Sequence, residues 1–529
     1  MNLNHINVIA RYEVKLVKRS WLFRIFAILA LLFISAIMLG YQTGIVNRMD
    51  NLWPRIAVSS LMPFCNTYFY NIAQSVIVVF LAGSFLKRDK KLDTAEVIYV
   101  RPMSNADYIV GKTWGIVKVF ITLNVITLLF TAFLNILINK SPFDLFPYLF
   151  YLLTISVPSL LFVLGLSFTA MCILKNQAVT FIVMLGIIGT VFFYLTDTLY
   201  GVFDFFGVNI PAIFSDVTGH ADLRLFLLQR FSYLLAGIGL ISMTIALVKR
   251  LPHKPWKIAV VYTFSSLFLL AACLGGLLYI LHYNHQLDLR HQYIMTFDKY
   301  ADVPHVDLLV NDISVTPQGH RLAGKSTVKV ANNNAKPLDK IIFYLNPELT
   351  VTSVEMAGKN LPFRRDHQVI EVDQPIQQQE ELTLTINYEG KISENICYTD
   401  VLTEDYLDTK VPQVFWRFGK RYAWLSNTFT LLTPECIWYP VTIAPVNPGA
   451  PYNVRKNFTD YTLTVHYEGD KTVLSQGKSK IDGSVITFTN TSALPGISLT
   501  IADYDKKALR VDSTDYEIYY FKGHDYFSK

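Results

Sequence analysis

Two glycine–lysine pairs come nearest to nucleotide chemistry in this chain of 529 residues. A phosphate-binding loop has the spacing G-x-x-x-x-G-K-[ST], in which glycines let backbone N–H groups approach the phosphates and the lysine reaches the outer ones. We predict that the complete motif is absent at both pairs, Gly111-Lys112 and Gly324-Lys325; at the first of them, Ala106 stands where the earlier glycine would be needed. We therefore expect no nucleotide cofactor in this chain.

The eleven histidines are the next candidates for chemistry, because zinc peptidases place two histidines and a general base in the pattern H-E-x-x-H. None of the eleven is followed by glutamate, and no two lie four residues apart with a glutamate between them. We therefore predict no catalytic residue and no metal site. The chain alone is not expected to be an enzyme.

The most informative polar residues lie in one charged stretch between two apolar segments, residues 87–112. The pattern predicts two short helical pieces, because a capping residue followed three positions later by an acidic residue marks a helix start. Pro102 separates the pieces, since a proline ends the preceding helix. The two start signals are Asp93 with Glu96 and Ser104 with Asp107. A capped, charged helix between apolar segments indicates a surface on which another protein docks.

Seven apolar stretches are long enough to cross a bilayer, which needs about 20 mostly apolar residues. They contribute to a composition that is 52% hydrophobic and 17% charged, with a mean hydropathy of +0.32. We predict an α-helical, polytopic membrane domain of six to seven spans, in which the sixth could begin earlier than its apolar core, near Leu225. The predicted spans are Trp21–Tyr41, Thr67–Leu86, Thr113–Ile138, Phe146–Ile173, Ala178–Leu199, Phe231–Val248 and Trp256–His282.

Residues 1–20 are predicted to form an amphipathic helix before the first span, with Arg11, Lys15 and Lys18 on one face. Such a helix can lie in the membrane interface with its basic face toward lipid phosphates. The alternative is an ordinary, positively charged flank of the first span.

The distribution of lysine and arginine predicts the orientation, because cytoplasmic loops carry the excess of these residues. One set of loops holds fifteen of them and the opposite set holds five. The N-terminus and residues 87–112 are therefore predicted to be cytoplasmic. With seven spans the C-terminal half lies outside the cytoplasm, and with six it lies inside. The formal net charge of +6 is explained largely by these loops, which meet anionic lipid, so we expect no nucleic-acid partner.

Residues 87–112 resemble the cytoplasmic coupling region of the type-2 ABC exporter permeases. That family shows a charged run, then Thr-x-Glu, an apolar turn, Pro-x-Ser, and Gly-Lys entering the next span. Asp93 stands where a glycine is common in the family. The residues that fit the order are Thr94, Glu96, Pro102, Ser104, Gly111 and Lys112.

The resemblance implies that this chain is a permease half whose ATP-binding-cassette ATPase is a separate subunit. It also implies a second permease half, identical or related, and a multi-pass location in the bacterial cytoplasmic (inner) membrane, in contact with membrane lipid. The residues assigned to ATPase coupling on this basis are Asp93, Thr94, Glu96, Arg101, Pro102 and Ser104.

The C-terminal half follows a different period, in which apolar and polar residues alternate as in half-buried strands. We predict an all-β antiparallel external domain over 305–529, joined by a linker at 284–304 to the transmembrane permease domain at 21–283. The predicted strands are Val306–Val315, Lys325–Val330, Lys340–Leu345, Thr350–Met356, Gln368–Val372, Leu382–Tyr388, Tyr461–Tyr467, Val473–Leu474, Val485–Phe488, Ile497–Ile501 and Tyr516–Phe521.

Residues 305–522 resemble the N-terminal β domain of the aminopeptidase N family of zinc metallopeptidases. Leu382–Gly390 is similar to a strand of that family that ends in Tyr-x-Gly, and Cys436–Pro440 is similar to the stretch before its second β layer. In that family the zinc ligands lie in a following helical domain. Since the zinc motif is missing here, we expect the β domain without its zinc site.

Two other functions stay open at this point. The chain could be the membrane-anchored front part of an aminopeptidase whose catalytic domain is missing or acts in trans. Alternatively, the β domain could recruit an envelope partner.

Five cysteines do not form a framework, but two of them lie in the predicted external half. A disulfide between Cys397 and Cys436 could persist there. The sequence leaves open whether these two residues meet.

Overall fold

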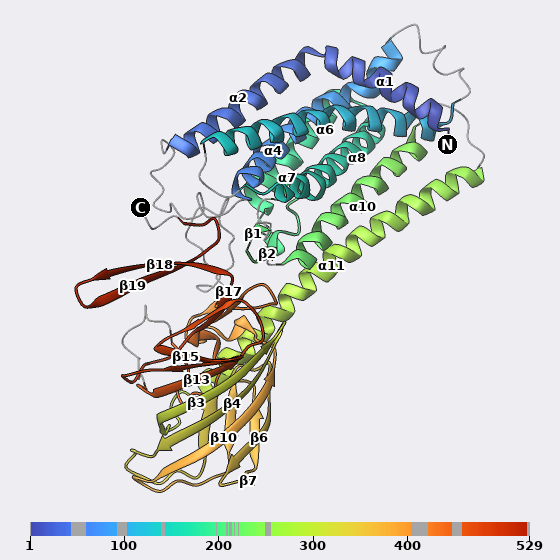
Figure 1. Ribbon diagram of the computed structural model, residues 1–529. Coiled ribbons are helices and arrows are strands. Elements are labelled where there is room, and N and C mark those ends of the chain that lie inside the picture. Colours follow the sequence, from blue (N-terminus) through green and yellow to red (C-terminus); the bar gives the residue numbers. More distant parts are fainter. Residues whose placement is uncertain are drawn as a thin grey trace. The chain divides into compact units, whose positions relative to one another are not determined.

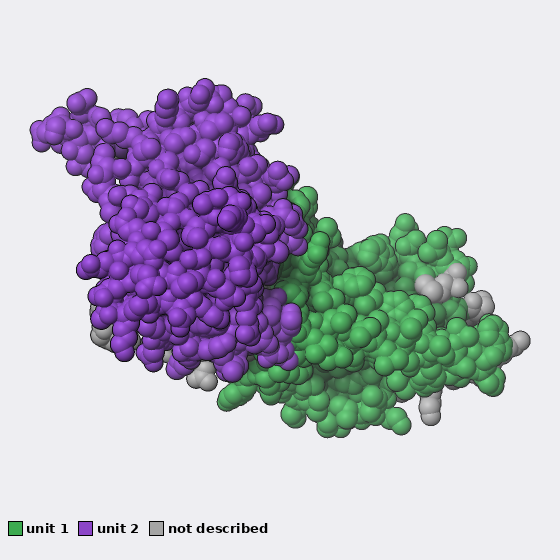
Figure 2. Space-filling model, turned by 90° about the horizontal axis from the view of Figure 1, so that it is seen from below, with its two compact units in different colours: residues 1–283, 411–418 green, residues 284–410, 419–529 purple. Residues whose placement is uncertain are grey.

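The computed structural model describes residues 2–43, 60–91, 103–138, 143–196, 198–207, 210, 214–215, 217–220, 222–248, 255–403, 422–446 and 457–525. These residues form two compact units (Figure 2), of which the first ends at Tyr283 and the second begins at Asn284. The first unit is helical, and the second consists largely of strands (Figure 1).

Six helices among the described residues are long and apolar enough to cross a membrane, and the pair α1 and α2, bent by 71°, makes a seventh if it counts as one span. The prediction of six to seven apolar, span-length helices is therefore confirmed. The α-helices of the described residues, among which α7 and α8 together make one span, are α1 (Leu3–Arg19), α2 (Trp21–Thr43), α4 (Leu61–Lys91), α6 (Asn105–Ile138), α7 (Phe146–Tyr151), α8 (Val157–Leu174), α9 (Gln177–Thr190), α10 (Leu223–Leu247) and α11 (Pro255–Tyr300).

Two of these helices contain irregular turns. A π-helical turn, η1 (Leu152–Ser156), joins α7 to α8, and another, η2 (Val191–Leu195), extends α9. After the 3-10 turn η3 (Thr198–Gly201) and a short hairpin of β1 (Phe214–Ser215) and β2 (Gly219–His220), the chain enters α10. The helix α10 begins at Leu223, close to the earlier start near Leu225 that the sequence allows, and it therefore includes Arg230.

Small residues let α8 and α10 approach closely, as they do in many membrane helix pairs. A Cβ atom at Gly237 would lie 2.7 Å from the carbonyl carbon of Leu161, and one at Gly165 would lie 2.8 Å from the carbonyl oxygen of Gly237. The Thr169 hydroxyl donates across the same interface to the Leu240 carbonyl at 2.9 Å. This contact fixes α10, and with it Arg230, against α8.

The second unit is built around an eight-stranded sheet in the order β15-β16-β13-β3-β4-β10-β6-β7. Smaller sheets have the orders β11-β12-β17-β14 and β5-β9-β8, and β18 pairs with β19. The strands are β3 (Asp307–Gln318), β4 (Arg321–Ala331), β5 (Ile341–Tyr344), β6 (Leu349–Met356), β7 (Lys359–Asn360), β8 (Phe363–Asp366), β9 (Val369–Val372), β10 (Glu381–Gly390), β11 (Ala423–Leu425), β12 (Thr430–Leu432), β13 (Asp460–His466), β14 (Thr472–Ser475), β15 (Lys478–Asp482), β16 (Val485–Thr489), β17 (Leu499–Ala502), β18 (Tyr504–Val511) and β19 (Thr514–Phe521).

Each predicted strand overlaps one of these, but the expectation of a wholly antiparallel domain is wrong at one pair. β13 runs parallel to β3. In the chain, β3 and β13 are separated by the strands β4 to β12. A tight hairpin would force two neighbouring strands to be antiparallel, but strands this far apart in sequence can also pair in parallel.

The segment expected to be a linker, 284–304, is mostly helical, because α11 continues to Tyr300. Its last turns belong to the second unit, where Tyr293 and Tyr300 are buried in the core of the β sheets. Arg290 is also buried and donates to four carbonyl oxygens, those of Asn395, Cys397, Tyr398 and Val401, at 2.9–3.1 Å. Here a helix end is an integral part of the β unit.

Candidate docking site at the start of α6

The predicted docking segment is described only at its C-terminal end. Asp93, Thr94, Glu96, Arg101 and Pro102 lie outside the described residues. Ser104 is described, and it stands immediately before α6. The structure therefore describes the helix that follows the predicted docking segment.

Ser104 and Asp107 form a reciprocal helix cap. The Asp107 N–H donates to the Ser104 hydroxyl at 3.0 Å, and the Ser104 N–H donates to the Asp107 carboxylate at 3.1 Å. Each side chain satisfies a backbone donor that the first helical turn leaves without a partner. The second predicted helix start is thus confirmed.

The same carboxylate joins α6 to the N-terminus of α1. Asp107 accepts a hydrogen bond from the backbone N–H of Asn2 at 2.8 Å, and the His5 ring nitrogen lies 3.7 Å from its other oxygen. At the same end of α6, the Asn105 amide donates to the Val248 carbonyl, just after α10, at 2.9 Å. The start of α6 is consequently held by both α1 and α10.

Two glycines allow α1 to lie directly on α6. A Cβ atom at Gly111 would be 2.8 Å from the Cβ of Ile9, and one at Gly115 would be 2.7 Å from the Cβ of Glu13 and 2.9 Å from the Ala10 carbonyl oxygen. Cβ atoms do not occur at such separations, so a side chain at either position would push the helices apart. The spacing of four residues places both glycines on one face of α6.

An ion pair lies inside this helix contact. The Lys112 ammonium is 3.7 Å from the Glu13 carboxylate, and the two side chains are only 5% and 4% exposed. Lys112 also lies over the Tyr108 ring, 5.1 Å from its centre. Two desolvated charges of opposite sign hold each other in place, because either one alone would be costly to bury.

The rest of α1 presents a basic surface. Its buried face consists of Ile6, Ala10, Glu13 and Val17. Arg11, Lys15 and Lys18 are exposed, in agreement with the predicted amphipathic pattern. The position of α1 at a membrane interface stays a prediction.

A second polar cluster surrounds Arg230, a residue for which the sequence predicts no site. The guanidinium is 1% exposed and donates to the Thr154, Ile155, Asp204 and Phe205 carbonyls and to the Ser159 hydroxyl, at distances from 2.6 to 3.3 Å. Thr154 and Ile155 belong to η1, a π-helical turn of a kind frequent at functional sites. Asn71 of α4 joins the cluster through hydrogen bonds to the Ser159 hydroxyl and the Phe206 carbonyl. The cluster cross-links α4, α8, α10 and the loop that contains Asp204.

The prediction that the phosphate-loop motif is absent is wrong at the level of sequence, because the motif occurs once. Gly319 lies five residues before Gly324, and Gly324-Lys325-Ser326 completes the spacing. The fold gives these residues another role. Gly319 turns between β3 and β4 with a φ of +59°, and a Cβ at Gly324 would lie 2.4 Å from the Tyr388 ring. Because Lys325 and Ser326 are paired on both sides within the sheet, no helix N-terminus is available to cradle phosphate.

Metal chemistry finds no support among the described residues, where no group of three or more His, Cys, Asp or Glu side chains could hold an ion. Cys397 and Cys436 are both buried in the β unit as free thiols. Burial raises the pKa of each thiol well above its ordinary value, which disfavours the thiolate, the nucleophilic form of cysteine. A disulfide between them stays a prediction.

No family model and no curated protein matches this chain. Among solved structures, a mutant of the M1 zinc metallopeptidase from Deinococcus radiodurans is similar at 15% identity and a TM-score of 0.30, covering 40% of this chain and 46% of that one. The unmutated enzyme gives 15% identity and a TM-score of 0.29, with the same coverage. The match spans about half the length of the metallopeptidase.

Proposed function

We propose that this chain is the membrane-spanning permease subunit of an ATP-binding-cassette exporter, with its ATPase on a separate chain that docks on residues 87–112. The observation that carries the proposal is the start of α6. A docking segment must transmit force into the membrane helices, and this one leads directly into a helix whose first turn is capped and tied to α1 and α10.

The apolar helices support the membrane placement. In the most apolar part of α11 only 11% of the residues are buried, and in that of α9 only 22%. Apolar side chains exposed along whole helices are costly in water and stable in a bilayer or against another apolar helix. Membrane lipid and a second permease half, in a homodimer or a heterodimer, are therefore the proposed neighbours of these faces.

The source of energy for transport is assigned from the stretch with phosphate-loop spacing. The single stretch with phosphate-loop spacing is part of the β3–β4 hairpin, so ATP hydrolysis is assigned to the partner. The proposed location is a bacterial inner membrane, with the N-terminus in the cytoplasm and the β unit outside it.

Co-purification tests the proposal. The full chain, tagged and extracted from its native membranes in mild detergent, should bring down an ATP-binding-cassette ATPase that mass spectrometry identifies. Glu96→Lys, in the docking segment, should abolish its recovery. Glu468→Lys, an equal charge change at an exposed site in the β unit, should not. Equal recovery with both variants would contradict docking on residues 87–112.

A further inference from the structure

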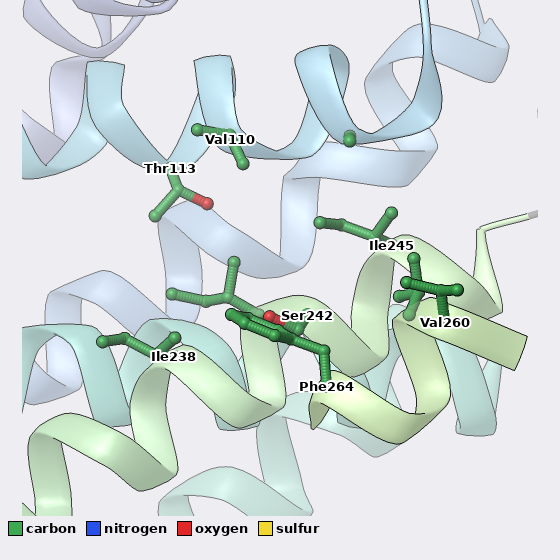
Figure 3. Close-up of a pocket in the computed structure, with 10 residues that line it drawn as sticks. Val110, Thr113, Ile238, Ser242, Ile245, Val260 and Phe264 are labelled. Carbon is green, nitrogen blue, oxygen red and sulfur yellow. The ribbon is translucent and has the colours of Figure 1, made fainter. Parts of the chain in front are cut away.

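A cavity of about 430 Å³ lies between α6, α10 and α11 (Figure 3). This volume falls within the range of roughly 300–1,000 Å³ that is typical of ligand sites. Figure 3 shows residues of α6 on one side of the cavity and residues of α10 and α11 on the other. The lining residues are Ala106, Val110 and Thr113 of α6, Ile238, Ile241, Ser242 and Ile245 of α10, and Val260, Val261 and Phe264 of α11.

The lining suits an apolar ligand. It contains no charged residue and two hydroxyl groups, of which that of Thr113 already donates to the Ile109 carbonyl of its own helix at 2.9 Å. An ionic or strongly polar ligand would lose its hydration here without gaining partners. A hydrocarbon loses nothing, because the walls are aliphatic and aromatic.

The α11 wall is open at the side. Val260 is 57% exposed and Phe264 is 48% exposed, although both line the cavity. A long apolar chain can therefore enter laterally, from the region that a bilayer would occupy. Contact with three helices at once distinguishes this cavity from an ordinary exposed face of one helix.

Positive charge lies at one end of the cavity. Trp256 and Lys257 precede Val260 and Val261 by one helical turn, so they continue the same wall of α11. Both are exposed, and the Lys257 ammonium is 5.6 Å from the centre of the Trp256 ring. The sequence adds Lys249, Arg250 and Lys254 in the connection from α10 to α11. Tryptophan and lysine at a helix end are typical of a membrane interface, and basic residues there attract anionic headgroups.

We propose that this cavity binds an acyl chain of an anionic phospholipid whose phosphate lies near Lys257. The inference rests on the membrane placement in the proposed function and does not depend on ATPase docking. The apolar cavity selects the tail and the basic end selects the headgroup charge, so one molecule satisfies both.

Photo-cross-linking tests the site in the full chain, reconstituted in phosphatidylcholine nanodiscs. One probe is phosphatidylglycerol with a diazirine in the middle of one acyl chain, and the other is phosphatidylcholine with the same chain. The phosphatidylglycerol probe should label peptides that contain Ile245, Val260 and Phe264 several-fold more strongly than the phosphatidylcholine probe. Lys257→Gln should reduce this preference about fivefold, as expected for one lysine near an anionic surface.

A matched pair of tryptophan variants separates the cavity from the rest of α11. Val260→Trp fills the open side and should reduce labelling of the α10 peptide that contains Ile245. Leu274→Trp, at a position 56% exposed on the same helix and outside the cavity, should leave it unchanged. Circular dichroism and gel filtration confirm that each variant is folded.

Three results would overturn the lipid site: labelling spread evenly along α11, equal capture of both probes, or cross-linking of two copies of the chain through the cavity residues. Alkaline carbonate extraction reports the membrane placement separately. If the chain is extracted, the placement itself fails, whereas an integral chain with even labelling refutes the cavity site alone.

Discussion

Among the described residues, each unit of the molecule buries one arginine almost completely, and the two are held in different ways. Arg230 in the helical unit donates to groups on η1, on α8 and in the loop that contains Asp204. Arg290 in the β unit donates to four carbonyls within residues 395–401. The first arginine therefore fixes several elements to one another, and the second fastens residues 395–401 to the end of α11.

Both arginines show how this protein stabilises a positive charge in its interior. In both units a guanidinium with five N–H donors forms hydrogen bonds with carbonyl oxygens that lie outside the α-helices and β-strands. The desolvated charge is tolerated because nearly every donor has an acceptor. Substitution of the two arginines should have different consequences. Residues 395–401 can move so that their carbonyls bind water, whereas the packed helices around Arg230 cannot separate in this way.

The largest effect is expected at Arg230. Arg230→Leu should lower the free energy of unfolding by roughly 5 kcal/mol, because several buried carbonyls and the Ser159 hydroxyl lose a donor together. Thermal unfolding in detergent, followed by tryptophan fluorescence, measures the change. A loss no greater than that of Arg290→Leu would remove the distinction between the two arginines.

The next effect is expected at the ion pair between α1 and α6. Lys112→Met removes the ammonium that faces the buried Glu13 carboxylate and should cost about 3 kcal/mol. The double variant with Glu13→Leu should recover most of that loss, since the buried carboxylate is removed together with the ammonium. Lys506→Ala serves as the control, because it breaks an exposed pair with Glu517 and should not change the melting temperature. A double variant as unstable as Lys112→Met would show that the loss of stability does not come from the ion pair.

A smaller and more local effect is expected at Arg290. Arg290→Leu should cost about 2 kcal/mol, the value for carbonyls that can regain water when their segment moves. Hydrogen exchange should accelerate in residues 394–403 and stay unchanged in α8 and α10. Faster exchange throughout the helical unit would contradict the local role.

The smallest effect concerns acid. The Asp366 carboxylate accepts from Lys299, and the Glu371 carboxylate accepts from Tyr300 and Lys340; these hydrogen bonds hold the pKa of each acid below its ordinary value, while burial opposes them. Acids with a lowered pKa stabilise the fold above their unfolded pKa, near 4, and lose that contribution as the pH falls through the folded pKa. The β unit should therefore lose stability below about pH 4.5. In Tyr300→Phe this decline should be shallower when melting temperatures are compared from pH 6.5 to 3. An identical decline in both proteins would show that Tyr300 does not contribute.

Much of the fold could be predicted because the lengths of the apolar stretches and the alternation of apolar and polar residues are visible in the sequence. Apolar stretches of span length give the helices, and the alternation in Leu382–Tyr388 gives β10. By contrast, Lys478–Asp482 forms β15 with all five residues exposed, so alternation could not reveal it. The parallel pairing of β3 with β13 depends on contacts distant in sequence, and no local pattern encodes it.

The candidate site was less accessible to sequence reasoning. The cap of Ser104 and Asp107 follows a local spacing rule and was predicted. Glu13 and Arg230 were not, because hydropathy treats a charged residue beside an apolar run as exposed. One signal was present for Glu13, since it continues the face of Ile6, Ala10 and Val17 at helical spacing. The phosphate-loop letters at 319–326 show the reverse case, in which spacing without a strand–loop–helix context has no chemical meaning.

The affinity of the partner ATPase for this chain tests the central claim most directly. The ATPase recovered by co-purification would be titrated against the detergent-solubilised full chain and against a variant in which residues 88–101 are replaced by a glycine–serine linker of equal length. That replacement leaves the cap of Ser104 and Asp107 in place. We expect a Kd at least about 100-fold weaker for the variant, equivalent to about 2.8 kcal/mol. An unchanged Kd, with a folded helical unit, would contradict docking on this segment.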